Sequence, residues 1–444
     1  MNARIIGPAG RAAALLLLLA ATPLAAQEPP GAPAARTLGD VYRAAAAADP
    51  RMRQLELEAE QAALRLRAID AARLPAFGID GRAQHQSEVA SFPLRDPGGA
   101  PLITPPKDTF DVYVGVEQRL IDPTLAARAA LVRAELEEAR ARVATSLFAL
   151  RLEIDEAFFA AESAAARAKA IEVRMAALAR LEAVADARVR EGAALASEAR
   201  AIDATLLQRR QDLLQATARR HAALDRLGRL TGGAVTRDTT LVFPAALTDA
   251  PAAAFGAEAA AARSRPEYAQ FEKTRDRIAQ QASAVGVDAR PRLTAFARAG
   301  VGRPGLNFIA DDVNPYWMGG LQLRWAPWSW GAHAREREAL ALERDIVATE
   351  AEAFTARLER SLDGDLAEVE RLAGTLALDR QIVALREQIE GEARIRWEAR
   401  VISLAEYLDR SGELLDAEVA REEHRIALAA ARARVLTTAG LEVK

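Results

Sequence analysis

The sequence predicts a mainly helical protein that also contributes strands to a transmembrane β-barrel. Three observations support this fold class: two very long proline-free runs, two pairs of alternating strand-like segments, and a repeat of the whole pattern along the chain. Proline-free runs of this length favour long helices, whereas period-two alternation is typical of strands with one buried or lipid-facing side. The predicted architecture is a duplicated strand hairpin with long antiparallel coiled-coil helices and four strands per chain.

Composition excludes several classes of site. The chain has 444 residues, a net charge of −3 and no cysteine. Without cysteine there can be no disulfide, thiolate metal site, cysteine nucleophile or lipid on an amino-terminal cysteine. The charge balance gives no argument for binding nucleic acid.

The amino terminus indicates export. Residues 1–26 combine the basic residues Arg4 and Arg11 with an apolar core and small residues before a cleavage site near Ala26, which is typical of a signal peptide. Residues 27–36 are predicted to be a flexible leader. No later stretch approaches the roughly 18 apolar residues of a membrane-spanning helix, so an exported protein of this kind would cross a membrane only as a barrel.

The first half of the chain begins with a helix and a hairpin. Thr37–Ala72 has helical composition with a break at Asp49-Pro50, and Ala76–Gln84 and Phe110–Leu120 alternate on either side of a turn-rich loop. The apolar positions of the two strands are Phe77, Ile79, Gly81, Ala83, Phe110, Val112, Val114 and Val116. The polar positions are Asp80, Arg82, Gln84, Asp111, Tyr113, Glu117 and Arg119.

A long helix follows the hairpin. Apolar residues recur every seven positions at Leu136, Val143, Leu150 and Ala157, beside Leu147, Ile154 and Ala161, as in a coiled coil. From Pro123 to Gly192 this helix would be about 69 residues and roughly 100 Å long. Gly192 is predicted to end it in a turn, and residues 193–230 to return antiparallel.

The second half repeats the first. Pro123, Arg188 and Glu198 match Gly331, Arg396 and Glu406 at one constant offset along the chain. Residues 37–250 and 251–444 are therefore predicted to be two repeats of one layout. In each, two short helices stacked end to end would lie along the long one, forming a wall one layer thick.

The fourth strand lies in the tryptophan-rich stretch Pro315–Gly331. Its predicted lipid-facing residues, with an aromatic at each end of an apolar band, are Trp317, Leu321, Leu323 and Trp325. The alternative is an ordinary sheet strand with a tryptophan-rich end. Four strands cannot close a barrel, so several copies are needed; two would give eight strands and three would give twelve, enough for a lumen.

Over about residues 37–440 the sequence resembles the TolC family of outer-membrane efflux and secretion channels. The resemblance lies in the segments RLPAFGIDG and RPRLTAFARAG, the junctions VGVEQRLIDP and LQLRWAPWSWG, and the two helical tips. It implies a homotrimer, a twelve-stranded barrel in outer-membrane lipid and a periplasmic helical tunnel. It also implies that the tips dock to a periplasmic adaptor protein serving an inner-membrane transporter.

The resemblance assigns roles to the tips. The predicted adaptor-docking residues are Gly192, Ala193, Ala194, Arg400, Val401, Ile402 and Ser403. Gly192 matches the family's turn glycine, whereas Arg400 replaces the glycine of the second tip. Glu198, Glu406 and Asp409 match acidic residues at the periplasmic mouth; the alternative for each is a solvated helix face. Ile402 replaces a basic gate residue, so an ionic latch of that form is not expected.

No catalytic, cofactor or metal site is predicted. The four histidines, His85, His221, His333 and His424, lack metal-ligand spacing, and no phosphate-binding loop or nucleophile motif occurs. A secreted structural coiled coil, such as a filament or adhesin stalk, is the alternative to a channel. It would account for the helices and the signal peptide but not for two hairpins with an apolar face.

Overall fold

The computed structural model describes residues 35–90, 97–99, 105–193, 195–249, 264–307 and 311–442. The predicted signal peptide and most of the leader lie outside these residues. The first repeat contains α1 (Leu38–Ala48), α2 (Pro50–Ala71), β1 (Ala76–His85), β2 (Asp108–Ile121), α3 (Pro123–Arg190), α4 (Ala196–Leu230) and α5 (Ala246–Asp249). The second contains α7 (Pro266–Asp288), β3 (Arg292–Arg303), β4 (Asn314–Arg324), α8 (Ala332–Glu398) and α9 (Leu404–Ala439).

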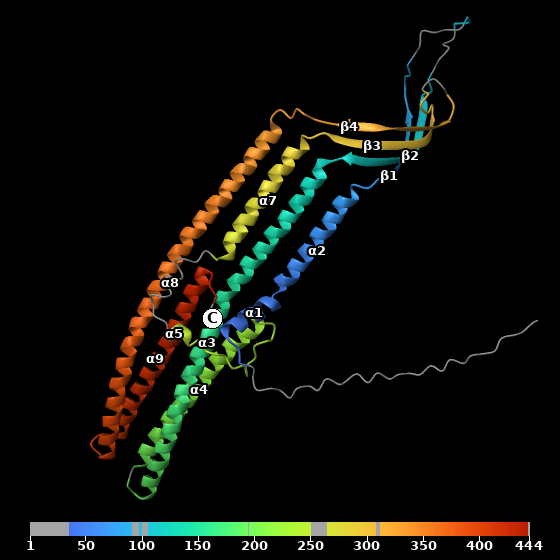
Figure 1. Ribbon diagram of the computed structural model, residues 1–444. Helices are drawn as coiled ribbons and strands as arrows, with labels where there is room; N and C mark the ends of the chain where they lie inside the picture. Colours follow the sequence, from blue (N-terminus) through green and yellow to red (C-terminus); the bar gives the residue numbers. More distant parts are fainter. Residues whose placement is uncertain are drawn as a thin grey trace, which may run out of the picture.

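The helices form the tall wall that the sequence predicts (Figure 1). The long helices α3 and α8 have 68 and 67 residues, and each is flanked by two short helices stacked end to end. The upper order across the wall is α8, α7, α3, α2, and the lower order is α8, α9, α3, α4. Helix α8 therefore forms one edge over the full height, and α2 and α4 together form the other.

Local signals set the helix starts. Asp49 and Asp122 accept hydrogen bonds from the backbone N–H groups of Arg51 and Thr124, and a proline follows each cap at the first helical position. These are favourable arrangements for groups that have no partner inside the helix. Pro50 and Pro123 thus mark where α2 and α3 begin.

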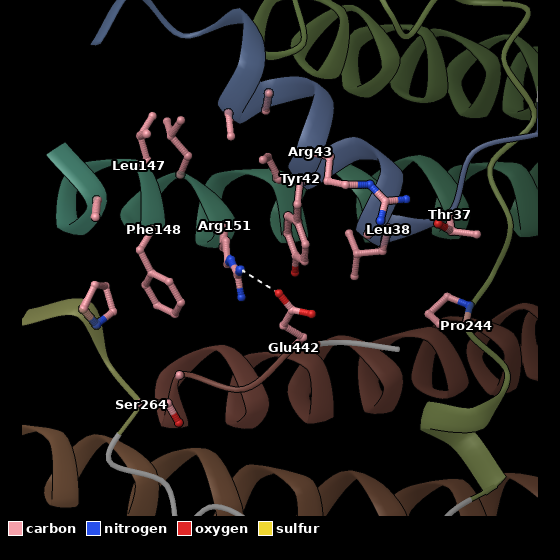
Figure 2. Close-up of a pocket in the computed structure, with 18 of the residues that line it drawn as sticks. Thr37, Leu38, Tyr42, Arg43, Leu147, Phe148, Arg151, Pro244, Ser264 and Glu442 are labelled. Atoms are coloured by element: carbon pink, nitrogen blue, oxygen red, sulfur yellow. Dashed lines mark ion pairs between the residues drawn. The ribbon is translucent and has the colours of Figure 1, made fainter. Parts of the chain in front are cut away.

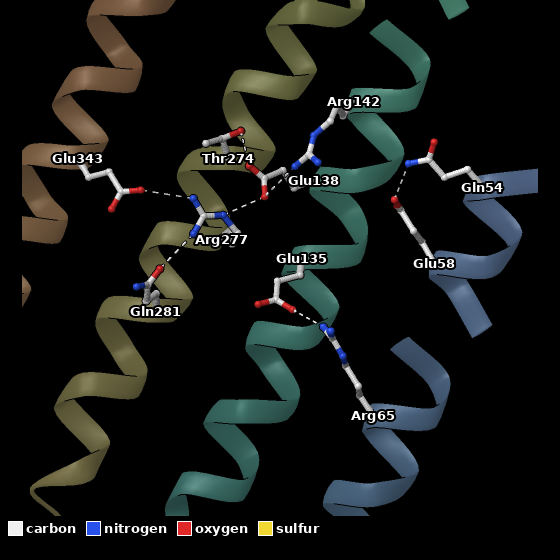
Figure 3. Close-up of polar contacts among 10 residues, drawn as sticks. All are labelled: Gln54, Glu58, Arg65, Glu135, Glu138, Arg142, Thr274, Arg277, Gln281 and Glu343. Carbon is white, nitrogen blue, oxygen red and sulfur yellow. Dashed lines mark hydrogen bonds and ion pairs between the residues drawn. The ribbon is translucent and has the colours of Figure 1, made fainter. Parts of the chain in front are cut away.

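The upper wall combines a small apolar cluster, around Ile278, Leu340 and Val347, with polar contacts between its helices (Figure 3). Arg277 of α7 lies between two carboxylates, 2.9 Å from Glu138 of α3 and 3.4 Å from Glu343 of α8. Arg65 of α2 reaches Glu135 of α3 at 3.3 Å. Partly exposed ion pairs of this kind stabilise little individually. These ion pairs indicate that the faces of the upper wall meet water and that no thick apolar core lies there among the described residues.

The main core lies at mid-height and makes the wall locally thicker than predicted. Here α1, the segment 231–249 and α5 pack onto α3, α4 and α9 around the buried side chains of Val41, Ile154, Phe158, Leu224 and Val435. Arg36, at the end of the predicted leader, pairs with Leu241 in a parallel bridge. The expectation of a single layer is wrong at this level, because α1 and residues 231–249 of the first repeat fold back onto the wall.

One buried carboxylate joins three elements of this core. Asp155 of α3 accepts hydrogen bonds from Tyr42 of α1 and, at 3.2 Å, from Thr437 of α9. Tyr42 and Arg151 also line the adjoining cavity, where Arg151 lies 3.8 Å from Glu442 (Figure 2). Burial raises the pKa of Asp155 to about 6, against the opposing effect of the two hydroxyl groups, Arg151 and Arg434.

The raised pKa of Asp155 predicts a pH-dependent stability. The folded protein binds this proton more tightly than the unfolded chain, so the contribution is full below about pH 4 and is lost as the pH rises through about 6. The midpoint of thermal unfolding should therefore fall less between pH 4.5 and 7.5 in Asp155→Asn than in the native protein. Asp363→Asn is the control, because Asp363 occupies the same position in the second repeat and is exposed. Equal slopes in all three proteins would refute the assignment.

The four strands form one antiparallel sheet in the order β1-β2-β3-β4. The register aligns Ile79 with Val114, Val114 with Ala299, and Ala299 with Trp317. Residues directly opposite each other share a face, so the apolar positions of all four strands form one continuous surface. The predicted sorting of both hairpins into an apolar and a polar face is confirmed.

Candidate functional site

The apolar face of the sheet is uncovered. Phe77 and Trp317 are 79% and 80% exposed, and Ile79, Leu321 and Leu323 are also exposed. An apolar patch spanning four strands marks a surface that meets lipid or another protein. The opposite face carries charged and hydroxyl groups: Tyr316 donates a hydrogen bond to Asp111, and the guanidinium of Arg298 lies 4.9 Å from the ring centre of Tyr113.

The two predicted girdle tryptophans occupy different settings. Trp317 pairs with Ala299 and is level with Ile79, so it lies nearer the middle of the sheet than its end. Trp325 lies one residue beyond β4, and its indole N–H donates to the carbonyl oxygen of Ala289 at 3.1 Å. The sequence predicts one aromatic residue at each end of the apolar band. Trp317 instead lies away from the end of the sheet, because β1, β2 and β3 continue past the level at which β4 starts.

The two helical tips have the same turn geometry. Gly192 has φ 71° and Arg400 has φ 61°. The following N–H groups, of Ala193 and Val401, donate to the carbonyls of Arg188 and Arg396 at 2.8 Å in both tips. Left-handed backbone costs a non-glycine residue roughly 1 kcal/mol. Arg400 thus adopts the conformation of a turn glycine, and its guanidinium reaches the carbonyl of Ala193 in the other tip at 3.5 Å.

The tip residues differ in exposure. Gly192, Ala193, Arg400, Val401 and Ser403 are exposed, and Ala194 lies outside the described residues. Ser403 caps α9 by accepting a hydrogen bond from the N–H of Glu406 at 3.2 Å. Ile402 is half-buried against the apolar cluster between the tips. It acts there as a packing residue, which agrees with the absence of a basic gate residue at this position.

The three predicted mouth carboxylates lie at the starts of the return helices. Glu198 and Glu406 are in the first turns of α4 and α9, where a negative charge is favourable to the helix dipole. Glu198 is half-buried, whereas Glu406 and Asp409 are exposed. The structure brings the three to the same end of the wall. Which face of an assembled ring they line is still a prediction.

A set of contacts between the tips was not predicted from the sequence. The rings of Trp397 and Tyr407 stack with centres 5.4 Å apart, and Arg188 lies 5.6 Å from the centre of the Trp397 ring. Tyr407 donates to Glu390 at 3.0 Å, and burial together with that carboxylate raises the pKa of Tyr407 to about 12. Trp397 is the one tryptophan of the sequence outside Pro315–Gly331. Its position apart from the other four could have indicated a separate role at the tip.

Other kinds of site find little support in the described part of the chain. None of its helices is both long and apolar enough to cross a membrane. No group of three or more histidine and carboxylate side chains in the described ranges is arranged to hold a metal ion.

Comparison with known proteins defines the class. Residues 41–233 match the sequence model of the family described as outer membrane efflux protein. No curated protein matches the chain.

Solved structures share its fold at low sequence identity. The chain is similar to the CmeC outer membrane channel of Campylobacter jejuni, with 14% identity, 91% of this chain and 85% of that chain covered, and a TM-score of 0.60. It is similar to the outer membrane protein VceC of Vibrio cholerae, with 14% identity, 92% of this chain and 97% of that chain covered, and a TM-score of 0.60. It is also similar to the open state of the MtrE outer membrane channel of Neisseria gonorrhoeae. The sequence identity is 13%, the match covers 92% of this chain and 89% of that chain, and the TM-score is 0.62.

The family match and the fold together describe an outer-membrane channel with a periplasmic helical region. The first repeat of the chain thus matches the outer membrane efflux protein family, and the whole chain has the fold of TolC-like outer-membrane channels. Such proteins are conduits and not enzymes. The family match ends at residue 233, and the internal repeat extends the same fold through the second half. The alternative of a secreted structural coiled coil is not favoured.

Proposed function

We propose that three copies of this chain form the outer-membrane conduit of a tripartite efflux or type I secretion system. A periplasmic adaptor protein and an inner-membrane transporter would deliver cargo to the helical tips, and the cargo would leave through the barrel. One observation carries the proposal: a four-stranded sheet with one apolar and one polar face, from which a wall of long helices extends. Within the described chain, β1 and β4 each have one edge without a partner strand.

Open sheet edges are not tolerated in lipid, so other copies must close the barrel. Two copies give eight strands, whose interior side chains fill, whereas three give twelve and leave room for a lumen. Charged groups such as Asp80, Arg82 and Arg298 on the polar face favour the water-filled arrangement. The family that residues 41–233 match also supports a trimer.

The edges of the helical wall carry apolar stripes suited to the same closure. On α8 the exposed residues Leu378, Ile382, Leu385 and Ile389 follow a heptad pattern. They lie roughly 120° around the helix from the buried seam that contacts α9. On the opposite edge of the wall, α4 exposes Leu207 and Leu214, also one heptad apart.

The two stripes lie at matching heights. Counted along the helix from its tip end at Glu398, the α8 stripe extends from roughly 14 Å at Ile389 to roughly 30 Å at Leu378. Counted in the same way from the start of α4, Leu207 lies at roughly 16 Å and Leu214 at roughly 27 Å. The upper wall has a similar pair, with Leu342 and Ile346 on α8 and Leu57 and Leu64 on α2. In a ring whose axis runs along the helices, α8 of one copy would meet α2 and α4 of the next at these levels.

The assembly and its conduction can be tested directly. The detergent-corrected mass of the purified complex should be that of three chains, and the complex should form ion-conducting pores in planar bilayers. A stable monomer would contradict the barrel, and a trimer without conductance would contradict the conduit.

The tips are proposed to dock the adaptor. Their exposed apolar residues, Leu195 and Val401, lie beside the left-handed turns at Gly192 and Arg400. Exposed apolar side chains at the free end of the wall favour contact with a partner. Ala193, Ile402 and Ser403 complete this proposed surface, as would Ala194.

The mouth carboxylates are proposed to favour cations. Glu198, Glu406 and Asp409 of three copies would place up to nine carboxylates near one ring, and rings of this sign attract cations. The double variant Glu406→Gln/Asp409→Asn should lower cation preference in bilayer recordings at low salt, with a smaller effect at about 1 M, where screening acts within roughly 3 Å.

Glu370→Gln provides the control for the mouth. Glu370 is an exposed carboxylate of α8 roughly 40 Å above the tip, and its loss should leave the selectivity unchanged. Unchanged selectivity in the double variant would show that Glu406 and Asp409 form a solvated face and that the constriction lies elsewhere.

A further inference from the structure

The two repeats offer an internal comparison of their helical hairpins. One constant offset relates the left-handed turn at Gly192 to that at Arg400, and the left-handed Gly232 after α4 to Gly440 after α9. Each position of the α3–α4 hairpin can therefore be compared with its counterpart in α8–α9. The comparison reveals positions where the contact between the two helices is apolar in one hairpin and charged in the other.

One buried apolar pair of the first hairpin is replaced by an acid and a base in the second. Ile171 of α3 and Ala216 of α4 are 2% and 1% exposed. Their counterparts are Asp379 of α8, which is 8% exposed, and His424 of α9. The His424 Nδ1 atom lies 2.7 Å from a carboxylate oxygen of Asp379.

Two more positions have changed nearer the tip, one heptad from Ile171 on α3 and two heptads from Ala216 on α4. Leu178 and Ile202 are buried in the first hairpin, and Arg386 and Arg410 occupy their positions in the second. Both arginines contact Glu413, at 2.5 Å and 3.2 Å. The α8–α9 hairpin thus carries charged side chains at four positions that are apolar in α3–α4, among buried apolar residues such as Val383 and Leu415.

We propose that the Asp379–His424 pair makes the α8–α9 hairpin a pH-responsive clasp. Histidine is the side chain that ordinarily changes charge near neutral pH. With His424 protonated, the contact is a charge-assisted hydrogen bond, which is stronger than a neutral one. With His424 neutral, Asp379 remains a buried charge facing an uncharged ring. The clasp therefore holds the two helices together more tightly while the ring carries its second proton, and it loosens when that proton is lost.

The other charged groups around the pair already have partners of their own. On α9, Arg421 and Arg425 contact Glu422, and Glu423 contacts Arg167 of the neighbouring α3. Arg425 also lies over the ring of Phe243, from the segment that packs on this level. On α8 the residues one turn from Asp379 are uncharged: Thr375, Leu376, Ile382 and Val383. His424 and Asp379 are thus paired with each other across the two helices.

Hydrogen exchange of the full-length protein in detergent tests the clasp. Residues 372–386 are compared with residues 164–178, which occupy the same level of the first hairpin, at pH 5.5 and 7.5. The intrinsic pH dependence of exchange acts on both segments alike, so the ratio of their rates isolates local opening. In the native protein this ratio should rise about fivefold from pH 5.5 to 7.5, the difference expected between a charge-assisted and a neutral hydrogen bond.

Two variants separate the clasp from general effects of pH. Asp379→Ile/His424→Ala restores the residues of the first hairpin, and the ratio should then be independent of pH. His424→Gln retains an uncharged donor, and the ratio should stay at its neutral-pH value throughout. The proposal is overturned by a flat ratio in the native protein, or by an unchanged rise in either variant.

Discussion

Ile79→Arg is expected to destabilise the assembled barrel by about 2–4 kcal/mol per copy, because it would place a charge on the lipid-facing side near the middle of the strand. Ile79 is exposed and lies in the central rows of the sheet, level with Val114, Ala299 and Trp317. The measurement is the yield of trimer in the outer membrane together with its resistance to denaturant.

Two further arginine variants test which face of the strands meets lipid and how deep each residue lies in the membrane. Asp80→Arg changes the neighbouring residue, which points to the polar face, and should cost little. Leu323→Arg lies on the apolar face but near the end of β4, next to the helices. It should cost about 0–1 kcal/mol, as expected near the interface. Equal losses at Ile79 and Asp80 would show that the faces are wrongly assigned.

The fold was largely predictable because its strongest signals are periodic. Pro50, Pro123 and Pro266 stand at the first positions of α2, α3 and α7. Proline is tolerated there and nowhere later in a straight helix. Period-two alternation sorted the strands correctly, since a slip of one residue would have moved every apolar side chain to the other face. The constant offset between the two repeats then extended each assignment to the second half.

The mid-height core was not predictable in the same way. It depends on α1 and the segment 231–249, which pack through isolated residues such as Val41 and Val235. Isolated apolar residues in short segments carry no period, so the sequence does not indicate what they contact. Asp155 illustrates the limit: its hydroxyl partners lie 113 and 282 residues away along the chain.

At the two tips, one turn was predictable from the sequence and the other was not. The turn at Gly192 follows from the tolerance of glycine for left-handed backbone. The same turn at Arg400 has no such signal, and its side-chain contact with Ala193 depends on how the two hairpins pack. The carboxylates Glu406 and Asp409 lie at the tip end of the wall, and their role at a periplasmic mouth stays a prediction. Their environment in the assembled protein depends on neighbouring copies, which the sequence of one chain does not specify.

Leu385→Glu is expected to prevent formation of the trimer. Leu385 is 59% exposed in the single chain and lies in the middle of the α8 stripe, so a glutamate there would be buried against an apolar surface of the next copy. Burial of an unpaired charge in an interface is among the largest costs that one substitution can impose. The measurement is the ratio of trimer to monomer after purification in detergent, by mass.

The adjacent residue provides a control, and the opposite stripe provides a rescue. Ala384 is exposed and lies roughly 130° away from the centre of the stripe around the helix, so Ala384→Glu should leave the trimer intact. Leu207 of α4 lies within about 3 Å of the height of Leu385 in the proposed ring. The double variant Leu385→Glu/Leu207→Arg should therefore recover part of the trimer, because each glutamate would face an arginine of the neighbouring copy. If Leu385→Glu assembles as well as Ala384→Glu, α8 does not meet α4 of the next copy at this level.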